Sequence, residues 1–132
     1  VNMNQLENNA FFWQKIDSIF LASAVVITQP AGSNHPEYQN LIYPVDYGYL
    51  NETLSQDSLG ISVYKGSIST HIIDAMLVSA DILKKDIEVK LLLGCNAEEV
   101  DKILRFVNQT EFQKTILVRR GNTVPSWSNP DL

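Results

Sequence analysis

The chain has 132 residues, a formal net charge of −5 and a hydrophobic fraction of 45%. This length and composition predict a single globular domain over residues 1–132. The negative charge argues against a general nucleic-acid surface, and no apolar run reaches the length that crosses a membrane. A polar start without a signal pattern and a single cysteine, Cys95, predict a reducing, cytoplasmic setting.

The first predicted element is an amphipathic helix within residues 1–23. From about residue 6 to residue 23, Trp13, Ile16 and Phe20 recur on one helical face. The β-branched run AVVITQP then predicts a strand that ends at Pro30. A turn-rich loop, an extended but interrupted segment (LIYPVDYGYL) and a second loop (NETLSQDS) follow.

Three more predicted strands come next, with the sequences GISVYKG, HIIDAMLVSA and DIEVKLLLG. In the last of them, alternation places Glu88 and Lys90 on the face opposite four aliphatic residues, which are Ile87, Val89, Leu91 and Leu93. A helix capped by Asn96, with Glu99 completing a capping box, precedes a final strand, KTILVRR. Its closing arginines, Arg119 and Arg120, suggest a solvated strand edge, and residues 121–132 form an irregular tail.

The order of these elements predicts the fold class. Strands outnumber helices, and there is no regular alternation of strand and helix. We therefore predict an α+β, mostly β fold: a small antiparallel OB-like barrel, closed or partly open, with flanking helices. The second helix should pack outside it through four apolar residues, which are Val100, Ile103, Leu104 and Val107.

Five acids at strand ends or in loops are candidates for metal chemistry: Asp46, Asp57, Asp81, Asp86 and Glu88. Mg²⁺ takes oxygen ligands, often one or two carboxylates with waters and phosphate oxygens completing its shell. Cations and hydroxyls that could surround a phosphate are available at Tyr43, Tyr47, Lys65 and Lys90. The plain alternative is that these are ordinary solvated side chains.

The stretch from Tyr43 to Val63 resembles the signature of the soluble, Mg²⁺-dependent inorganic pyrophosphatases. That signature reads Tyr-Pro-x-Asn-Tyr-Gly, then a Thr-Leu-Ser-type turn, then Asp-Gly-Asp-Pro-x-Asp-Val. This chain has YPVDYG, TLS and DSLGISV in the same register, and the resemblance extends from about residue 25 to residue 94. It implies a pyrophosphatase-like fold, Mg²⁺ as the cofactor, and pyrophosphate or another phosphorylated small molecule as the ligand.

The resemblance also implies roles for single residues. Asp57 matches the first metal-binding aspartate, and Glu88 matches the aspartate two residues before the family's strand lysine. Asp81, or alternatively Asp86, matches the earlier acid of that loop. Substrate-binding positions fall on Tyr43, Tyr47 and Lys90, of which Tyr47 would contact a phosphate.

The departures from the family pattern concern the reaction itself. Leu59 stands where the family has its catalytic aspartate, so no catalytic residue is assigned. Ser62 replaces a metal ligand, Asp46 replaces the signature asparagine, and Glu37 lies near the position of a substrate lysine. The family's arginine before the signature and its late Tyr-Lys pair have no match here.

These departures predict a pyrophosphatase-like protein with a degenerate metal site. It would hydrolyse pyrophosphate weakly or not at all, while a phosphate or nucleotide ligand could still bind. One alternative is an active Mg²⁺-dependent pyrophosphatase, or a related phosphoanhydride hydrolase, with rearranged carboxylates. Another is a non-catalytic interaction module or partner subunit, and the sequence is compatible with a homo-oligomer.

Overall fold

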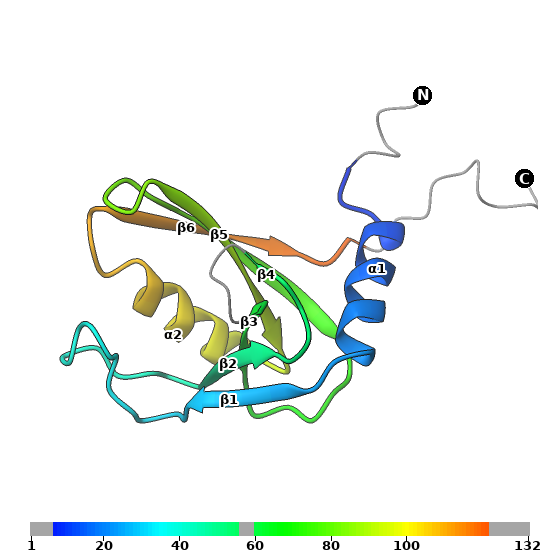
Figure 1. The fold of residues 1–132 in the computed structure, drawn as a ribbon, viewed down its shortest axis with the longest axis horizontal. Coiled ribbons are helices and arrows are strands. Elements are labelled where there is room, and N and C mark those ends of the chain that lie inside the picture. The colour runs from blue at the N-terminus through cyan, green and yellow to red at the C-terminus, as the bar shows by residue number, and fades with distance from the viewer. Residues whose placement is uncertain (1–6, 56–59, 122–132) are drawn as a thin grey trace, which may run out of the picture.

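The computed structural model of the chain describes residues 7–55 and 60–121. Six strands form one open sheet in the order β1-β2-β3-β5-β4-β6, with two helices packed against it (Figure 1). In chain order the elements are α1 (Ala10–Leu21), β1 (Val25–Gln29), β2 (Asp46–Leu50), β3 (Ser62–Lys65), β4 (Ile73–Asp81), β5 (Asp86–Leu93), α2 (Ala97–Val107) and β6 (Gln113–Arg119). The predicted α+β, mostly β fold with flanking helices is therefore confirmed, in its partly open form.

The connection between β3 and β5 explains why the sheet is not uniformly antiparallel. Four of the five strand pairings are antiparallel, and the exception joins β3 to β5 in parallel. After β3 the chain passes over to β4 and returns through a tight hairpin, which inserts β5 between β3 and β4. β5 thereby becomes a central strand, and its register with β3 sets Ser62 beside Lys90.

The core has two layers, one on each face of the sheet. Helix α2 covers one face through Val100, Ile103 and Val107, with Leu104 partly buried beside them, as the sequence predicts. Helix α1 covers part of the other face, where Trp13 is fully buried.

Both ends of α2 are fixed by hydrogen bonds. At the N-terminus the predicted capping box is present, because Asn96 and Glu99 exchange side-chain to backbone hydrogen bonds. Glu99 also accepts bonds from the backbone and hydroxyl of Ser67. At the C-terminus, Asn108 bonds to Leu104 and to the backbone of Thr115 in β6. These contacts hold α2 in one position over the sheet.

Helix α1 is attached to the end of β6 by polar contacts. The Arg120 guanidinium binds the Asp17 carboxylate through two nitrogen–oxygen pairs at 2.8 and 2.5 Å, and it also donates to the carbonyl of Ile73. Asn8 bonds to the indole N–H of Trp13 and to the backbone of residues 119 and 121. The prediction of a solvated edge is therefore wrong for Arg120, which uses its charge to join two elements far apart in sequence.

Replacing Asp17 by asparagine should lower the free energy of unfolding by about 1 kcal/mol, because the bidentate pair is lost in a partly shielded place. The side chains of Arg120 and Asp17 are only 20% and 24% exposed, respectively. The matched control is Asp101→Asn, since Asp101 (58% exposed) pairs with Arg105 (77% exposed) on the outer face of α2. Urea unfolding should show a clearly smaller loss for the control, and equal losses would contradict the assignment.

Candidate functional site

Lys90 lies at the centre of the predicted site, in the middle of β5. Its ammonium group is 3.3 Å from the hydroxyl oxygen of Tyr47 and 3.4 Å from a carboxylate oxygen of Glu88. The side chains of Lys90 and Glu88 are both only 17% exposed. Burial by itself would lower the pKa of Lys90, but the oxygens of Tyr47 and Glu88 outweigh it, so the pKa is raised. Lys90 is therefore protonated at neutral pH and is paired with the Glu88 carboxylate.

The three residues meet because of the strand register. Tyr47 of β2 is opposite Tyr64 of β3, and Tyr64 is opposite Leu92 of β5. Lys90 precedes Leu92 by two residues, so it points to the same face of the sheet as Tyr47 and Tyr64. Two separate strand pairings thus bring together a tyrosine and a lysine that are 43 positions apart in the sequence.

Tyr47 contacts two aromatic rings, one stacked on it and one tilted. Its ring centroid is 5.3 Å from that of Tyr43 and 4.7 Å from that of Tyr64. Tyr43 is buried and contacts the ring of Phe106 on α2. Burial raises the pKa of both Tyr43 and Tyr64. The predicted substrate-binding residue Tyr43 therefore lies in the core, where it supports Tyr47.

His35 extends this stack and was not predicted from the sequence. Its ring lies nearly parallel to Tyr43, with 5.8 Å between centroids, and its Nδ1 atom accepts hydrogen bonds from the backbone of Glu37 and Tyr38. Because Nδ1 is an acceptor, the fold favours the neutral imidazole, and burial lowers the pKa of His35. A single histidine in a turn-rich loop gives no sequence signal of this contact.

Two of the candidate acids support turns. An oxygen of Asp81 accepts hydrogen bonds from the backbone of Leu83 and Lys84, both at 2.9 Å, and so shapes the β4–β5 hairpin. An oxygen of Asp46 accepts from the backbone of Ala31 and closes the loop after β1. In residues 7–55 and 60–121, no three His, Cys, Asp or Glu side chains are grouped so that they could hold a metal ion.

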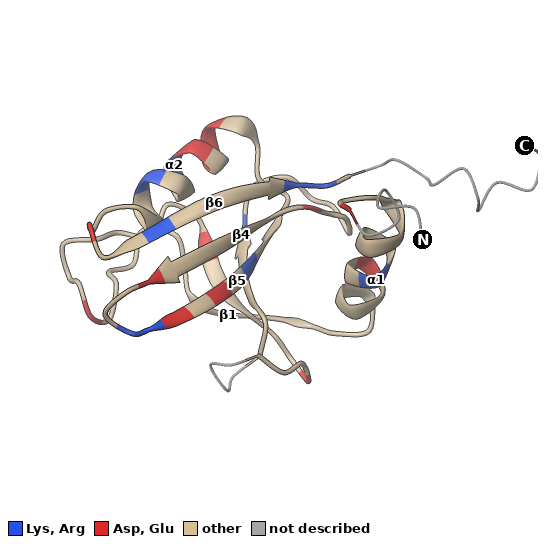
Figure 2. Ribbon diagram, turned by 90° about the horizontal axis from the view of Figure 1, so that it is seen from above, with Lys and Arg blue, Asp and Glu red and all other residues tan. Residues whose placement is uncertain are grey.

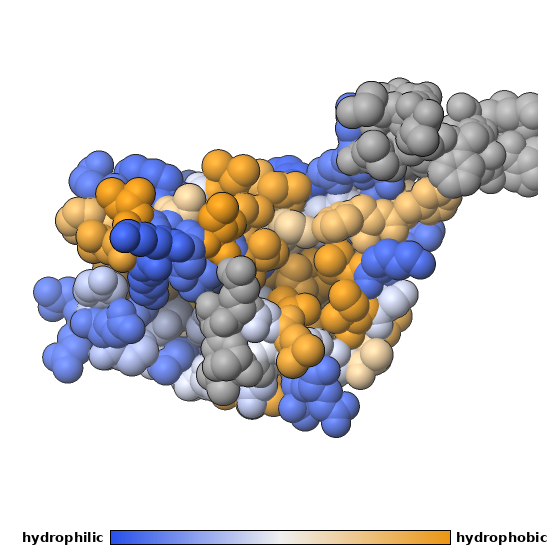
Figure 3. Space-filling view, turned by 45° about the horizontal axis from the view of Figure 1, so that its top comes forward, coloured by the Kyte–Doolittle hydropathy of each residue, from blue (hydrophilic) through white to orange (hydrophobic). Residues whose placement is uncertain are grey.

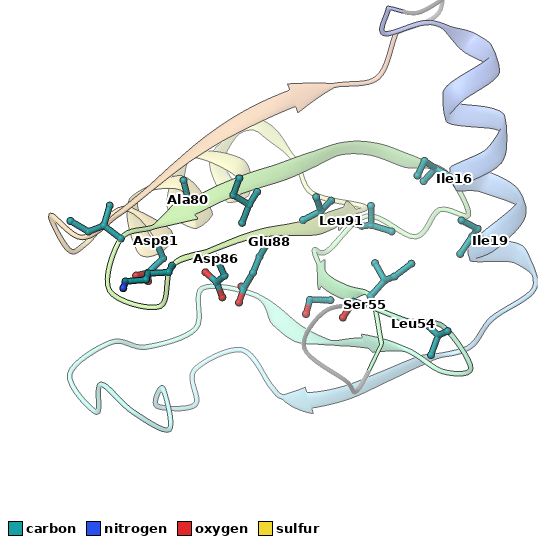
Figure 4. A pocket seen from close by; sticks show the side chains of 15 residues that line it. Ile16, Ile19, Leu54, Ser55, Ala80, Asp81, Asp86, Glu88 and Leu91 are labelled. Carbon is teal, nitrogen blue, oxygen red and sulfur yellow. The ribbon is translucent and has the colours of Figure 1, made fainter.

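Of the remaining predicted residues, Ser62 lies on the neighbouring strand β3, Asp86 begins β5, and two lie outside the described ranges. Ser62 is opposite Lys90 and borders one groove together with Glu88, Asp81 and Asp86 (Figure 4). Asp57 and Leu59 lie outside the described residues. The site thus brings together Tyr47, Glu88 and Lys90 directly, with Ser62 on the neighbouring strand.

Cys95 has no place in this chemistry. Its thiol lies near the carbonyl oxygens of Tyr64 and Leu93, and burial raises its pKa to about 11. At neutral pH the thiol is protonated and unreactive, which suits a small residue packed under the start of α2.

Comparison with known proteins shows which known fold this chain resembles. No protein-family model matches the chain, and no curated protein matches it. Among solved structures, an inorganic pyrophosphatase from Helicobacter pylori is similar, with a TM-score of 0.51 and 17% identity over 76% of this chain and 85% of that chain. An inorganic pyrophosphatase from Coxiella burnetii aligns with a TM-score of 0.47 and 15% identity over 70% of this chain and 81% of that one. The first of these shows that the chain has a pyrophosphatase-like fold.

No helix within the described ranges is both long and apolar enough to span a membrane.

The histidine in the aromatic stack predicts a pH effect on stability. Because its pKa is lowered on folding, the unfolded chain binds the proton more tightly, and stability should fall as pH drops from 7 through about 6.5 and below. Urea unfolding at several pH values between 7 and 5.5 measures this slope. His35→Asn should flatten the slope, and an unchanged slope in that variant would contradict the prediction.

Proposed function

We propose that this pyrophosphatase-like protein binds a phosphate-containing ligand at Lys90 and Tyr47 and hydrolyses pyrophosphate weakly or not at all. The observation that carries the proposal is the Lys90 ammonium group, held 3.3 Å from the Tyr47 hydroxyl on a central strand. An ammonium ion and a phenol hydroxyl are both hydrogen-bond donors to phosphate oxygens. Because both come from strands and are supported by stacked rings, little ordering is needed when a ligand binds.

Glu88 is the feature that limits ligand binding in this proposal. Its carboxylate lies 3.4 Å from the Lys90 ammonium and so competes with any anion for that charge. A divalent cation beside Glu88 would relieve this competition, because the carboxylate could then bind the cation. We therefore expect a phosphate ligand to bind more tightly together with Mg²⁺ than alone.

The residues present fit a two-metal centre poorly. Two ions about 4 Å apart need several carboxylates to offset their mutual repulsion. Asp46 and Asp81 each direct an oxygen to backbone N–H groups of nearby turns, and position 62 carries a hydroxyl instead of a carboxylate. By the sequence resemblance, position 59 also lacks the base. We infer that Mg²⁺, if bound, is held mainly by Glu88, waters and ligand oxygens.

The ligand site can be tested with two substitutions that have opposite expected effects. Lys90→Gln should weaken pyrophosphate binding about tenfold, because it removes the cation. Glu88→Gln should strengthen binding in the absence of metal roughly fivefold, because it removes the competing charge. Isothermal titration calorimetry with pyrophosphate and EDTA measures both constants.

Matched controls separate the site from general charge effects. Lys85→Gln changes a lysine in the hairpin turn, and Glu98→Gln changes a glutamate whose partner Lys102 lies on the surface of α2. Neither should alter pyrophosphate affinity by more than about twofold. Equal effects of the site and control variants would refute binding at Lys90.

Hydrolysis is the second test. Phosphate release from pyrophosphate with Mg²⁺ should be orders of magnitude slower than in an ordinary pyrophosphatase. The loss of the catalytic base and the loss of metal ligands should each lower the rate of hydrolysis. Leu59→Asp combined with Ser62→Asp should raise Mg²⁺ affinity, and adding Glu37→Lys should recover part of the turnover. Wild-type turnover at the ordinary level, in protein free of host enzyme, would favour the alternative of an active enzyme with rearranged carboxylates.

A further inference from the structure

The loop between β1 and β2 carries a half-exposed aromatic ring. Tyr38 lies in this loop and is 50% exposed. Its ring centroid is 5.3 Å from that of His35, and the two ring planes are inclined by 44°. The loop lies at the end of the molecule opposite α1, where Figure 3 shows mostly hydrophilic side chains, while the apolar ones gather in the middle and toward α1. The ring of Tyr38 is therefore an aromatic surface that a ligand can reach.

Hydrogen bonds of the backbone fix the position of Tyr38. Its N–H donates to Nδ1 of His35, and its carbonyl oxygen accepts from the N–H of Leu41. Nearer the base of the loop, the N–H of Tyr43 donates to the carbonyl of Ser33. Because these bonds close the loop on itself, its backbone needs little further ordering when a ligand contacts the ring.

A continuous row of aromatic rings connects this loop with Lys90. His35 stacks on Tyr43 with 5.8 Å between centroids, and Tyr43 stacks on Tyr47 at 5.3 Å. The Lys90 ammonium group lies 5.3 Å from the centre of the Tyr47 ring. The row thus begins at the half-exposed ring of Tyr38 and ends at the ammonium group to which we assign phosphate binding.

Two ammonium groups are close enough to His35 to affect its protonation. Burial lowers the pKa of His35, Glu37 opposes this effect, and the charges of Lys90 and Lys84 lower the pKa further. Lys84 belongs to the β4–β5 hairpin, where Figure 2 shows basic residues at the turn and acidic residues at the adjoining strand ends. An aromatic surface and two cations therefore lie in the same neighbourhood.

A bare phosphate gains little at this site, because acids compete for its cations. The Glu88 carboxylate is 3.4 Å from the Lys90 ammonium group, and Glu37 adds a second negative charge near His35. Stacking of a flat ring on an aromatic side chain does not depend on these charges. A ligand that has both an aromatic ring and a phosphate therefore gains affinity that a bare phosphate lacks.

We propose that the ligand of the Lys90 site is a nucleoside phosphate, whose base stacks on Tyr38 while its phosphate binds Lys90 and Tyr47. This inference rests on the proposed function and names the class of its ligand. Every base has a flat face, so stacking alone does not select one base. A base stacked on an aromatic side chain should strengthen binding by about tenfold or more.

The contribution of the base is tested by comparing AMP with ribose 5-phosphate, which has the same sugar and phosphate but no base. Isothermal titration calorimetry on the full chain with Mg²⁺ should show at least about tenfold tighter binding of AMP. Tyr38→Ala should reduce this preference to less than about twofold, while the affinities for ribose 5-phosphate and pyrophosphate stay unchanged. Tyr38→Trp should keep the preference, because tryptophan retains a flat aromatic face.

A control and two further measurements locate the bound nucleotide. Phe12→Ala removes a ring of similar exposure (47%) on α1 and should leave the preference for AMP unchanged. Nuclear Overhauser effects should connect the adenine protons with the ring protons of Tyr38. Lys90→Gln should weaken AMP and ribose 5-phosphate by the same factor, about tenfold, because both bind through the phosphate.

Several results would overturn the inference. These are equal affinities for AMP and ribose 5-phosphate, adenine contacts to a different ring, or AMP binding that does not respond to Lys90→Gln. Tyr38→Ala would also overturn it by weakening AMP, ribose 5-phosphate and pyrophosphate alike, as a purely structural role of the ring would. If ribose 5-phosphate and pyrophosphate bind but AMP is not preferred, this inference alone fails. If none of the three binds, the proposed function fails with it.

Discussion

A lysine ammonium group that is mostly shielded from water must be compensated by nearby oxygens, and this constraint organises the centre of the molecule. Lys90 meets it with Tyr47 and Glu88, at 3.3 and 3.4 Å. The first contact requires the antiparallel pairing of β2 with β3 and the parallel pairing of β3 with β5 in one register. A shift of either register by one residue would turn the side chains to the other face and leave the charge without its partners. The polar centre and the sheet topology therefore depend on each other.

Much of the fold could be predicted from the sequence, because its strongest signals are local. The capping box at Asn96 and the apolar stripe of α2 specify that helix and its buried face without reference to the rest of the chain. The parallel β3–β5 pair has no such local signal. It forms only because the β4–β5 hairpin packs with β5, and not β4, next to β3. The same is true of the Asp17–Arg120 pair, whose partners are separated by 103 positions.

The candidate site was predictable in part, for a related reason. Alternation along β5 places Glu88 and Lys90 on one face, and the signature resemblance adds Tyr47. Residue type alone could not distinguish a carboxylate that faces a ligand from one that shapes a turn. One oxygen of Asp46 and one of Asp81 accept hydrogen bonds from backbone N–H groups of turns, a role that the sequence does not signal. His35 joins the aromatic stack only because its loop folds back over Tyr43, and neither residue signals this in the sequence.

The central proposal is that Tyr47 and Glu88 compensate the charge of Lys90 and fix its position on β5. The most direct measurement is the pKa of the Lys90 ammonium group, followed through its ¹³Cε signal in selectively labelled protein. The account predicts a pKa above the ordinary lysine value, lower in both Tyr47→Phe and Glu88→Gln than in the wild type. A wild-type pKa at or below the ordinary value, unchanged in both variants, would show that these oxygens do not stabilise the charge and would contradict the account.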